Sequence, residues 1–138
     1  MYKGTTAALE KSQGLSIKQI GVIAIHAFIG WALCAASMGI GLAVTTEQNA
    51  LIIHAIGAPI FFFGVSLSYF SKYNYTSPLK TAAIFVGFII VVDFFVVSML
   101  ILKSFDMFAS PLGTWIPFAL IFTSTFLTGT YITKKSTR

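Results

Sequence analysis

Four long stretches of almost unbroken hydrophobic residues organise this chain, and short polar connections separate them. The stretches cover residues 20–44, 50–70, 82–102 and 112–133. About 20 apolar residues cross the hydrocarbon core of a bilayer as a helix, so each stretch is long enough to span it. Helix is the expected form because lipid cannot satisfy backbone polar groups and because the stretches lack the alternation of a barrel strand. The pattern predicts an all-α integral membrane protein.

The connections between the stretches are short and cover residues 45–49, 71–80 and 103–111. Short links make consecutive helices antiparallel neighbours, which predicts a four-helix up-down-up-down bundle. We expect residues 1–138 to form a single transmembrane domain, because no linker or low-complexity segment separates a second one. The first stretch resembles a signal peptide, but its length of roughly 25 residues exceeds the 7–15 of a cleaved apolar region, so a permanent helix is expected.

Composition supports the membrane assignment. Hydrophobic residues make up 57% of the chain and charged residues 9%, with a mean hydropathy of +0.87. A soluble domain has about 25% charged residues. The single cysteine, Cys34, excludes an internal disulfide and CxxC-type sites, and its apolar surroundings indicate an inert thiol. No basic patch is interleaved with stacking aromatics, so the expected partner is the lipid bilayer and not nucleic acid.

The basic residues predict the orientation of the helices. Eight of the nine lysines and arginines precede the first stretch, lie between the second and third, or follow the fourth. These eight are Lys3, Lys11, Lys18, Lys72, Lys80, Lys134, Lys135 and Arg138. The other two connections hold only Lys103. Because cytoplasmic segments carry an excess of lysine and arginine, we expect both termini in the cytoplasm, with the helices in a plasma or inner membrane.

One acidic residue, Asp93, interrupts the third stretch within the segment FIIVVDFFVVS at residues 88–98. With a helical rise of about 1.5 Å per residue, Asp93 lies roughly 17 Å deep, close to the middle of a hydrocarbon core about 30 Å thick. Insertion scales assign a cost of about 2.5–3.5 kcal/mol to an aspartate at this depth. We therefore expect Asp93 to face the bundle, either as a functional group or as a lock between helices.

Other polar residues fall at neighbouring depths. By the same rise, His26 lies roughly 10 Å from the inner edge and His54 roughly 6 Å from the outer edge. The cluster at residues 123–125 reaches about the level of Asp93. These positions predict a ladder of polar groups that could bind a proton or a small ligand. Its expected members are Asp93, His54, His26, Thr125, Ser124 and Ser37.

Small residues and prolines mark the helices that surround this ladder. Small residues allow a neighbouring helix to approach closely. On the first helix they share one face with two polar side chains, as His26, Gly30, Cys34, Ser37 and Gly41. Pro59 and Pro117 lie inside the second and fourth stretches, where they predict kinks.

Signatures of known chemistries are not found. The two histidines differ in depth by roughly 14 Å on these dimensions, so they cannot readily ligate one haem iron or join Asp93 around one metal ion. The sequence contains neither GxSxG nor HExxH, the motifs of common hydrolases. We therefore expect no cofactor, no metal and no defined catalytic residue.

Three functions remain open. The first is a transporter- or channel-like protein that binds or conducts a proton or small solute, as a homo-oligomer if four helices enclose too little volume. The second is a structural or accessory subunit of a larger membrane assembly, with Asp93 as an interhelical lock. The third is a membrane enzyme that uses one histidine and one aspartate as an acid–base pair. A polar cavity favours the first, a dry core the second, and a cleft joining histidine to Asp93 the third.

Overall fold

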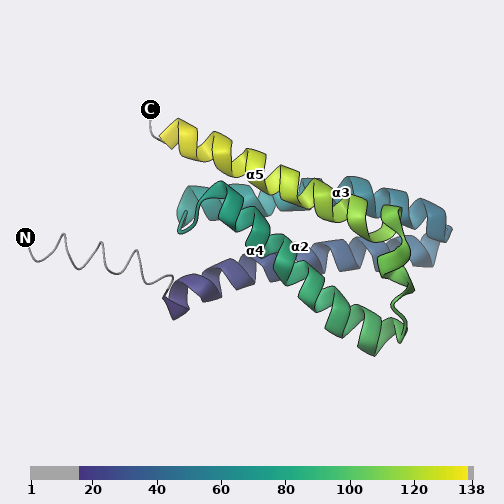
Figure 1. The fold of residues 1–138 in the computed structure, drawn as a ribbon. Helices are drawn as coiled ribbons and strands as arrows, with labels where there is room; N and C mark the ends of the chain where they lie inside the picture. Colours follow the sequence, from purple (N-terminus) through teal and green to yellow (C-terminus); the bar gives the residue numbers. More distant parts are fainter. Residues whose placement is uncertain (1–15, 137–138) are drawn as a thin grey trace, which may run out of the picture.

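A computed structural model describes residues 16–136 of the chain, in which every regular element is a helix (Figure 1). In chain order the elements are α2 (Ile17–Val44), α3 (Glu47–Lys72), α4 (Pro78–Val92), η1 (Asp93–Leu102), η2 (Asp106–Ala109), η3 (Pro111–Trp115) and α5 (Ile116–Ser136). The prediction of an all-helical fold is confirmed for this part of the chain. Lys3, Lys11 and Arg138, which contribute to the predicted orientation, lie outside the described residues.

Four helical units are long and apolar enough to cross a membrane. They are Ile17–Val44, Glu47–Lys72, Pro78–Leu102 and Pro111–Lys135. The third unit joins α4 to η1, and the fourth joins η3 to nearly all of α5. Each unit contains one of the hydrophobic stretches and extends beyond it by a few polar or small residues.

The polar residues before each unit explain where the helices begin. The hydroxyl oxygens of Ser16, Thr46, Ser77 and Ser110 each accept a hydrogen bond from the backbone N–H three residues further on. Such caps satisfy backbone donors that have no partner inside the helix. The predicted starts fell later because hydropathy finds the apolar part of a helix and misses its cap.

α3 contacts α2 along one side and α5 along another (Figure 1). α4 packs against α5 and, less extensively, against α2, and it makes little backbone contact with α3. Two glycines permit the closest approaches. A Cβ atom at Gly30 of α2 would overlap the ring of Phe62 on α3. A Cβ atom at Gly129 of α5 would come within 2.5 Å of the Phe70 ring and 2.9 Å of Pro78.

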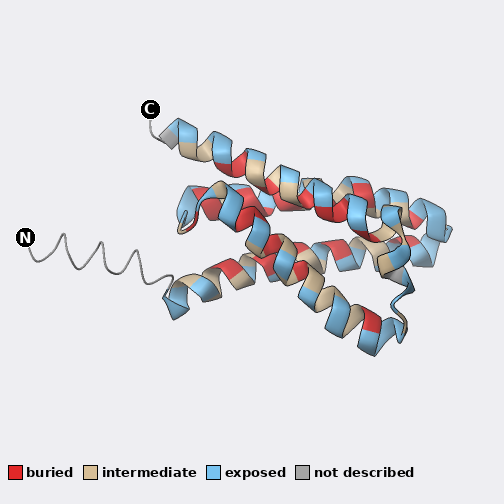
Figure 2. Ribbon diagram, in the orientation of Figure 1, coloured by how far each residue is buried: buried red, intermediate tan, exposed pale blue. Residues whose placement is uncertain are grey.

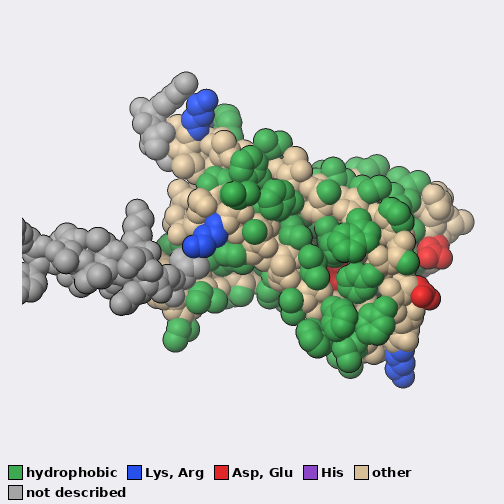
Figure 3. All heavy atoms as spheres, viewed as in Figure 1, with side chains coloured by type: hydrophobic (Ala, Val, Ile, Leu, Met, Phe, Trp, Pro, Cys, Tyr) green, Lys and Arg blue, Asp and Glu red, His purple; other side chains and the backbone are tan. Residues whose placement is uncertain are grey.

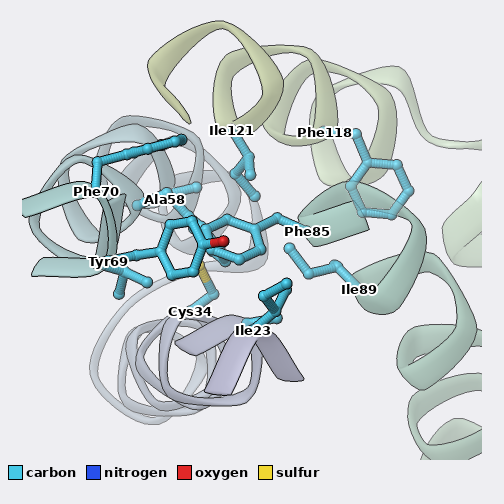
Figure 4. Close-up of a cluster of buried hydrophobic side chains, with 12 residues drawn as sticks. Ile23, Cys34, Ala58, Tyr69, Phe70, Phe85, Ile89, Phe118 and Ile121 are labelled. Carbon is cyan, nitrogen blue, oxygen red and sulfur yellow. The ribbon is translucent and has the colours of Figure 1, made fainter. Parts of the chain in front are cut away.

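Aromatic and aliphatic side chains fill the space between the four helices (Figure 4). The rings of Phe62 and Phe85 lie 5.9 Å apart, and Tyr69 meets Phe85 edge-on at 6.0 Å. The buried cluster consists of Ile23, Ala27, Cys34, Ala58, Phe62, Val65, Tyr69, Phe70, Phe85, Ile89, Phe118 and Ile121. The centre of the bundle is therefore apolar and closely packed.

The third unit changes character at Asp93, where α4 gives way to the π-helix η1. Of the described elements, only α4 makes more than marginal contact with η1, and Figure 1 shows η1 leaving the other helices. Ser98 is the one buried residue of η1, so Figure 2 shows this segment largely exposed. We call Asp93–Leu102 the η1 arm. The sequence predicted one continuous bundle helix here, and the arm departs from that expectation.

The two prolines behave differently. Pro59 lies inside α3, which continues through it from Glu47 to Lys72. Pro117 is the second residue of α5, directly after the π-helix η3. Because the helical unit runs on from Pro111 through Pro117, the missing N–H of Pro117 removes one backbone hydrogen bond where the π-helical and α-helical spacings meet. Pro117 thus marks the change from η3 to α5 and does not interrupt the interior of α5.

Candidate functional site at Asp93

Asp93 occupies the junction between α4 and the η1 arm. Its backbone N–H donates to the carbonyl oxygen of Ile89, four residues earlier as in an α-helix, and also to that of Ile90, three residues earlier. Its carboxylate points to α2, where Oδ1 accepts a hydrogen bond of 2.8 Å from Nε1 of Trp31. The side chain is half-buried. Asp93 therefore connects α4 to α2 at the point where the third unit leaves the bundle.

Trp31 is the partner that the sequence analysis did not identify. An indole N–H can only donate, and it usually finds an acceptor when the ring is buried. Hydrogen bonds to a carboxylate are stronger than those between neutral groups. A signal was present in the sequence, because Trp31 follows Ile17 by 14 residues and Asp93 follows Pro78 by 15. Two helices that start at the same end of a bundle place these residues at the same level.

His54 and Ser37 meet at the backbone of Cys34, one turn beyond Trp31 on α2. The hydroxyl of Ser37 donates to the Cys34 carbonyl oxygen at 2.8 Å. The imidazole of His54, from α3, interacts with the same backbone. Nδ1 of His54 is buried and has no hydrogen-bond partner among the described residues. Cys34 itself is a buried free thiol.

His26 lies in a different environment, among the aromatic residues at the end of α3. Its Nδ1 donates to the Val22 carbonyl oxygen at 2.8 Å. Its ring meets those of Tyr69 and Tyr73 edge-on, with centroids 5.6 and 5.4 Å away. These contacts fasten the first turns of α2 to the last turns of α3.

The Tyr69 hydroxyl organises the turn that follows α3. It accepts hydrogen bonds of 3.1 Å from the backbone N–H groups of Tyr75 and Thr76, and it pairs with the Thr76 hydroxyl at 2.8 Å. The Thr76 hydroxyl in turn bonds to that of Thr81 on α4. All of these groups are satisfied locally, so His26 has an aromatic neighbour in Tyr69 and not a proton-transfer partner.

The hydroxyl groups of α5 attach this helix to α3. Ser124 donates to the Pro59 carbonyl oxygen at 2.8 Å, and Thr125 pairs with Ser66 at 3.2 Å in a fully buried contact. Thr123 points away and bonds to the Ala119 carbonyl oxygen within its own helix. Ser124 and Thr125 therefore belong to the α3–α5 contact.

The structure thus distributes the expected ladder over separate places. Asp93 pairs with Trp31, His54 joins Ser37, His26 lies among tyrosines, and Ser124 and Thr125 bind α3. Within residues 16–136, no hydrogen bond connects one of these groups to another. The centre of the same bundle holds apolar side chains that are at most 4% exposed, namely Phe62, Phe85, Ile89 and Ile121.

The arrangement limits the chemistry of the described residues. They include no group of three or more His, Cys, Asp or Glu side chains that could hold a metal ion. Neither histidine forms a hydrogen bond with Asp93. Asp93 thus provides a hydrogen-bond acceptor at the first residue of the apolar η1 arm. A carboxylate offers about four acceptor positions, and Trp31 uses one of them.

The η1 arm presents bulky apolar side chains on most of its surface. The ring of Phe94 lies 5.1 Å from that of Phe105 and 6.3 Å from that of Phe108, in the connection that follows the arm. The large exposed side chains of the arm are Phe94, Phe95, Met99, Leu100, Ile101 and Leu102. Figure 3 shows hydrophobic side chains crowded on the face of the molecule that it presents.

No family model matches the chain, and neither the curated proteins nor the solved structures include one that matches it. The function must therefore be inferred from the helices and from the surroundings of Asp93.

Proposed function

We propose that this chain is a structural or accessory subunit of a larger membrane assembly, in which the η1 arm packs against a transmembrane helix of a partner. The chain crosses the membrane four times in an up-down-up-down course, and both termini lie in the cytoplasm. One observation carries the proposal: the third unit leaves its own bundle at Asp93, an acid that is costly to place within a membrane helix.

The packing of the arm supports this proposal. Transmembrane helices associate through close packing and through hydrogen bonds between polar groups, because lipid tails remove the hydrophobic driving force. The arm makes few contacts with α2, α3 and α5, so its apolar surface is left for lipid or for another helix. π-Helical segments are rare and often occur at functional sites.

Asp93 distinguishes a partner helix from lipid. The Asp93 carboxylate receives one hydrogen bond, from Trp31, among the described residues. Inside a bilayer an aspartate is costly unless further donors lie close to it. Lipid tails cannot supply a donor, whereas a partner helix that carries a serine, threonine, asparagine, lysine or arginine can. The partner therefore presents such a donor to Asp93 while its apolar face covers the arm.

Site-specific photo-crosslinking in native membranes tests this function. A photoreactive residue at Leu100 of the arm is compared with one at Leu127 of α5, which are 71% and 59% exposed. We expect Leu100 to form a protein adduct of one defined mass, and Leu127 to react mainly with lipid. The adduct should disappear in the Asp93→Leu background. Lipid adducts alone at both positions would refute the proposal.

A second function, binding or conduction of a proton or small solute, is favoured by one observation. Nδ1 of His54 is buried without a partner among the described residues, which leaves a polar atom available to a ligand. In this function a homo-oligomer completes the path that one bundle does not form. Purified protein in liposomes should then carry a proton flux that is lost in His54→Ala. Equal flux in empty and protein-containing liposomes would exclude conduction.

A further inference from the structure

A groove opens between the start of α4 and the end of α5, at the opposite end of α4 from Asp93. Its volume is about 390 Å³, within the range of about 300–1,000 Å³ typical of small-molecule sites. The first turn of α4 and its cap contribute Ser77, Pro78 and Leu79. The last turns of α5 contribute Phe126, Thr130 and Lys134, among others.

The lining of this groove is largely apolar, with a few polar side chains. Pro78, Leu79 and Phe126 supply an apolar wall, and Ser77 and Lys134 supply polar groups where the two helices reach their ends. Ser77 also caps α4, because its hydroxyl accepts a hydrogen bond of 3.3 Å from the N–H of Lys80. A ligand that fits this lining has an apolar chain at one end and a polar head at the other.

The charges around the groove select the sign of that head. Lys134 lines the groove. Lys135 follows it in the last turn of α5, and Lys80 lies in the first turn of α4. The positive end of the α4 dipole and the negative end of the α5 dipole both lie at this groove, so the lysines set its sign. Within residues 16–136 the acids are Glu47, Asp93 and Asp106, none of which belongs to these turns. Figure 3 shows the exposed acidic side chains at the end of the molecule remote from the C-terminus.

We propose that this groove binds an anionic membrane phospholipid. One acyl chain lies against Phe126 and Leu79, and the headgroup phosphate lies near Lys134 and Lys80. Basic pockets between transmembrane helices on the cytoplasmic side are suited to such headgroups. The proposal goes beyond the assembly role, because it requires the four helices to be in a membrane but does not require a partner on the η1 arm.

Native mass spectrometry of the full chain in detergent tests the site. The probes are phosphatidylglycerol and phosphatidylcholine with identical acyl chains. We expect the first lipid bound to be phosphatidylglycerol, with a clear preference over phosphatidylcholine. Replacing Lys134 by Gln should weaken phosphatidylglycerol binding about fivefold, the effect of one lysine near an anionic lipid surface. Inorganic phosphate at the same concentration should not displace the lipid, because it lacks the acyl chain.

Two further variants separate a built site from general attraction. Lys103→Gln removes the same charge from the connection after η1 and should leave lipid binding unchanged. Thr130→Phe fills the groove without a change of charge and should lower the binding of both lipids. Equal losses in Lys134→Gln and Lys103→Gln, or equal binding of the two lipids by the unaltered protein, would overturn the proposal. A crosslinked partner at Leu100 would be unaffected by any of these outcomes.

Discussion

α4 and the η1 arm are consecutive parts of one apolar helical unit, yet one is packed into the bundle and the other is not. α4 buries Thr81, Ala82, Phe85 and Ile89, whereas the arm buries only Ser98. The difference lies in size and shape. α4 has alanine, threonine and glycine between its larger residues, while the segment DFFVVSMLIL has no alanine or glycine. In a membrane, small residues decide which helix surfaces meet, because hydrophobicity alone gives no preference.

The largest expected effect comes from removing one phenylalanine ring from α4 and one from the η1 arm. Phe85→Ala should destabilise the protein by about 3–5 kcal/mol, because the ring is fully buried against Phe62 and Tyr69 and leaves a cavity. Phe95→Ala should cost less than about 1 kcal/mol, since this ring is 55% exposed and its loss opens no cavity. Equilibrium unfolding in detergent measures both. Equal effects would mean that the arm is packed in solution.

The next test probes close contact between α5 and its neighbours. Gly129→Ala places a Cβ atom 2.5 Å from the Phe70 ring and should destabilise the protein by about 1–3 kcal/mol. Gly87→Ala in α4 is the matched control, because no atom lies within 4 Å of its added Cβ. The control should be neutral or slightly stabilising, since alanine favours helix. Tolerance of Gly129→Ala with full stability would argue against this helix contact.

The junction between the two parts can be tested through the Trp31–Asp93 hydrogen bond. Trp31→Phe removes the donor and should cost about 1–2 kcal/mol, between the average for membrane helices and the value for bonds to charged groups. Trp115→Phe provides the control, because its indole donates to the Phe108 carbonyl oxygen at an exposed site. A double-mutant cycle with Asp93→Ala isolates the coupling. Additive effects of Trp31→Phe and Asp93→Ala would contradict the interaction.

The smallest expected effect concerns the single buried residue of the arm. The hydroxyl of Ser98 is buried and has no partner among the described residues. Its removal in Ser98→Ala should therefore be neutral or stabilise the protein by up to about 1 kcal/mol. Ser66→Ala, which breaks the buried bond to Thr125, should instead destabilise it by about 1 kcal/mol. A loss of stability in Ser98→Ala comparable to that of Ser66→Ala would reveal a partner for Ser98.

The sequence predicted where the helices lie along the chain. It did not predict which face of each helix points into the bundle. Apolar runs locate four helical units because hydrophobicity is averaged over about 20 residues, and polar caps then account for the remaining few. Depth follows from position, but the direction of a side chain depends on which faces pack. Gly30 against Phe62 fixes one such face. This dependence explains why Asp93 pairs with Trp31, a residue that depth alone did not single out, while neither His26 nor His54 forms a hydrogen bond with it.

The hydrophobic pattern of the sequence did not predict that the η1 arm leaves the bundle either. Its residues are as apolar as those of α4, so periodicity and composition predict the same helix for both. The change at Asp93 arises from backbone hydrogen bonds that span five residues, which no side-chain pattern records. The surroundings of Asp93 therefore depend on Trp31 of α2 and on the course of the third unit, and neither follows from the hydrophobic pattern.

The self-contained turn after α3 has a consequence for biogenesis. The Tyr69 hydroxyl of α3 bonds to the turn, and the Thr76 hydroxyl of the turn bonds to Thr81 of α4. These hydrogen bonds hold the turn between α3 and α4 in place. α3 and α4 themselves make little backbone contact, and α4 packs mainly on α5. We expect the turn to close as soon as α4 has been made, whereas α4 reaches its packed position only when α5 docks against it and against α3.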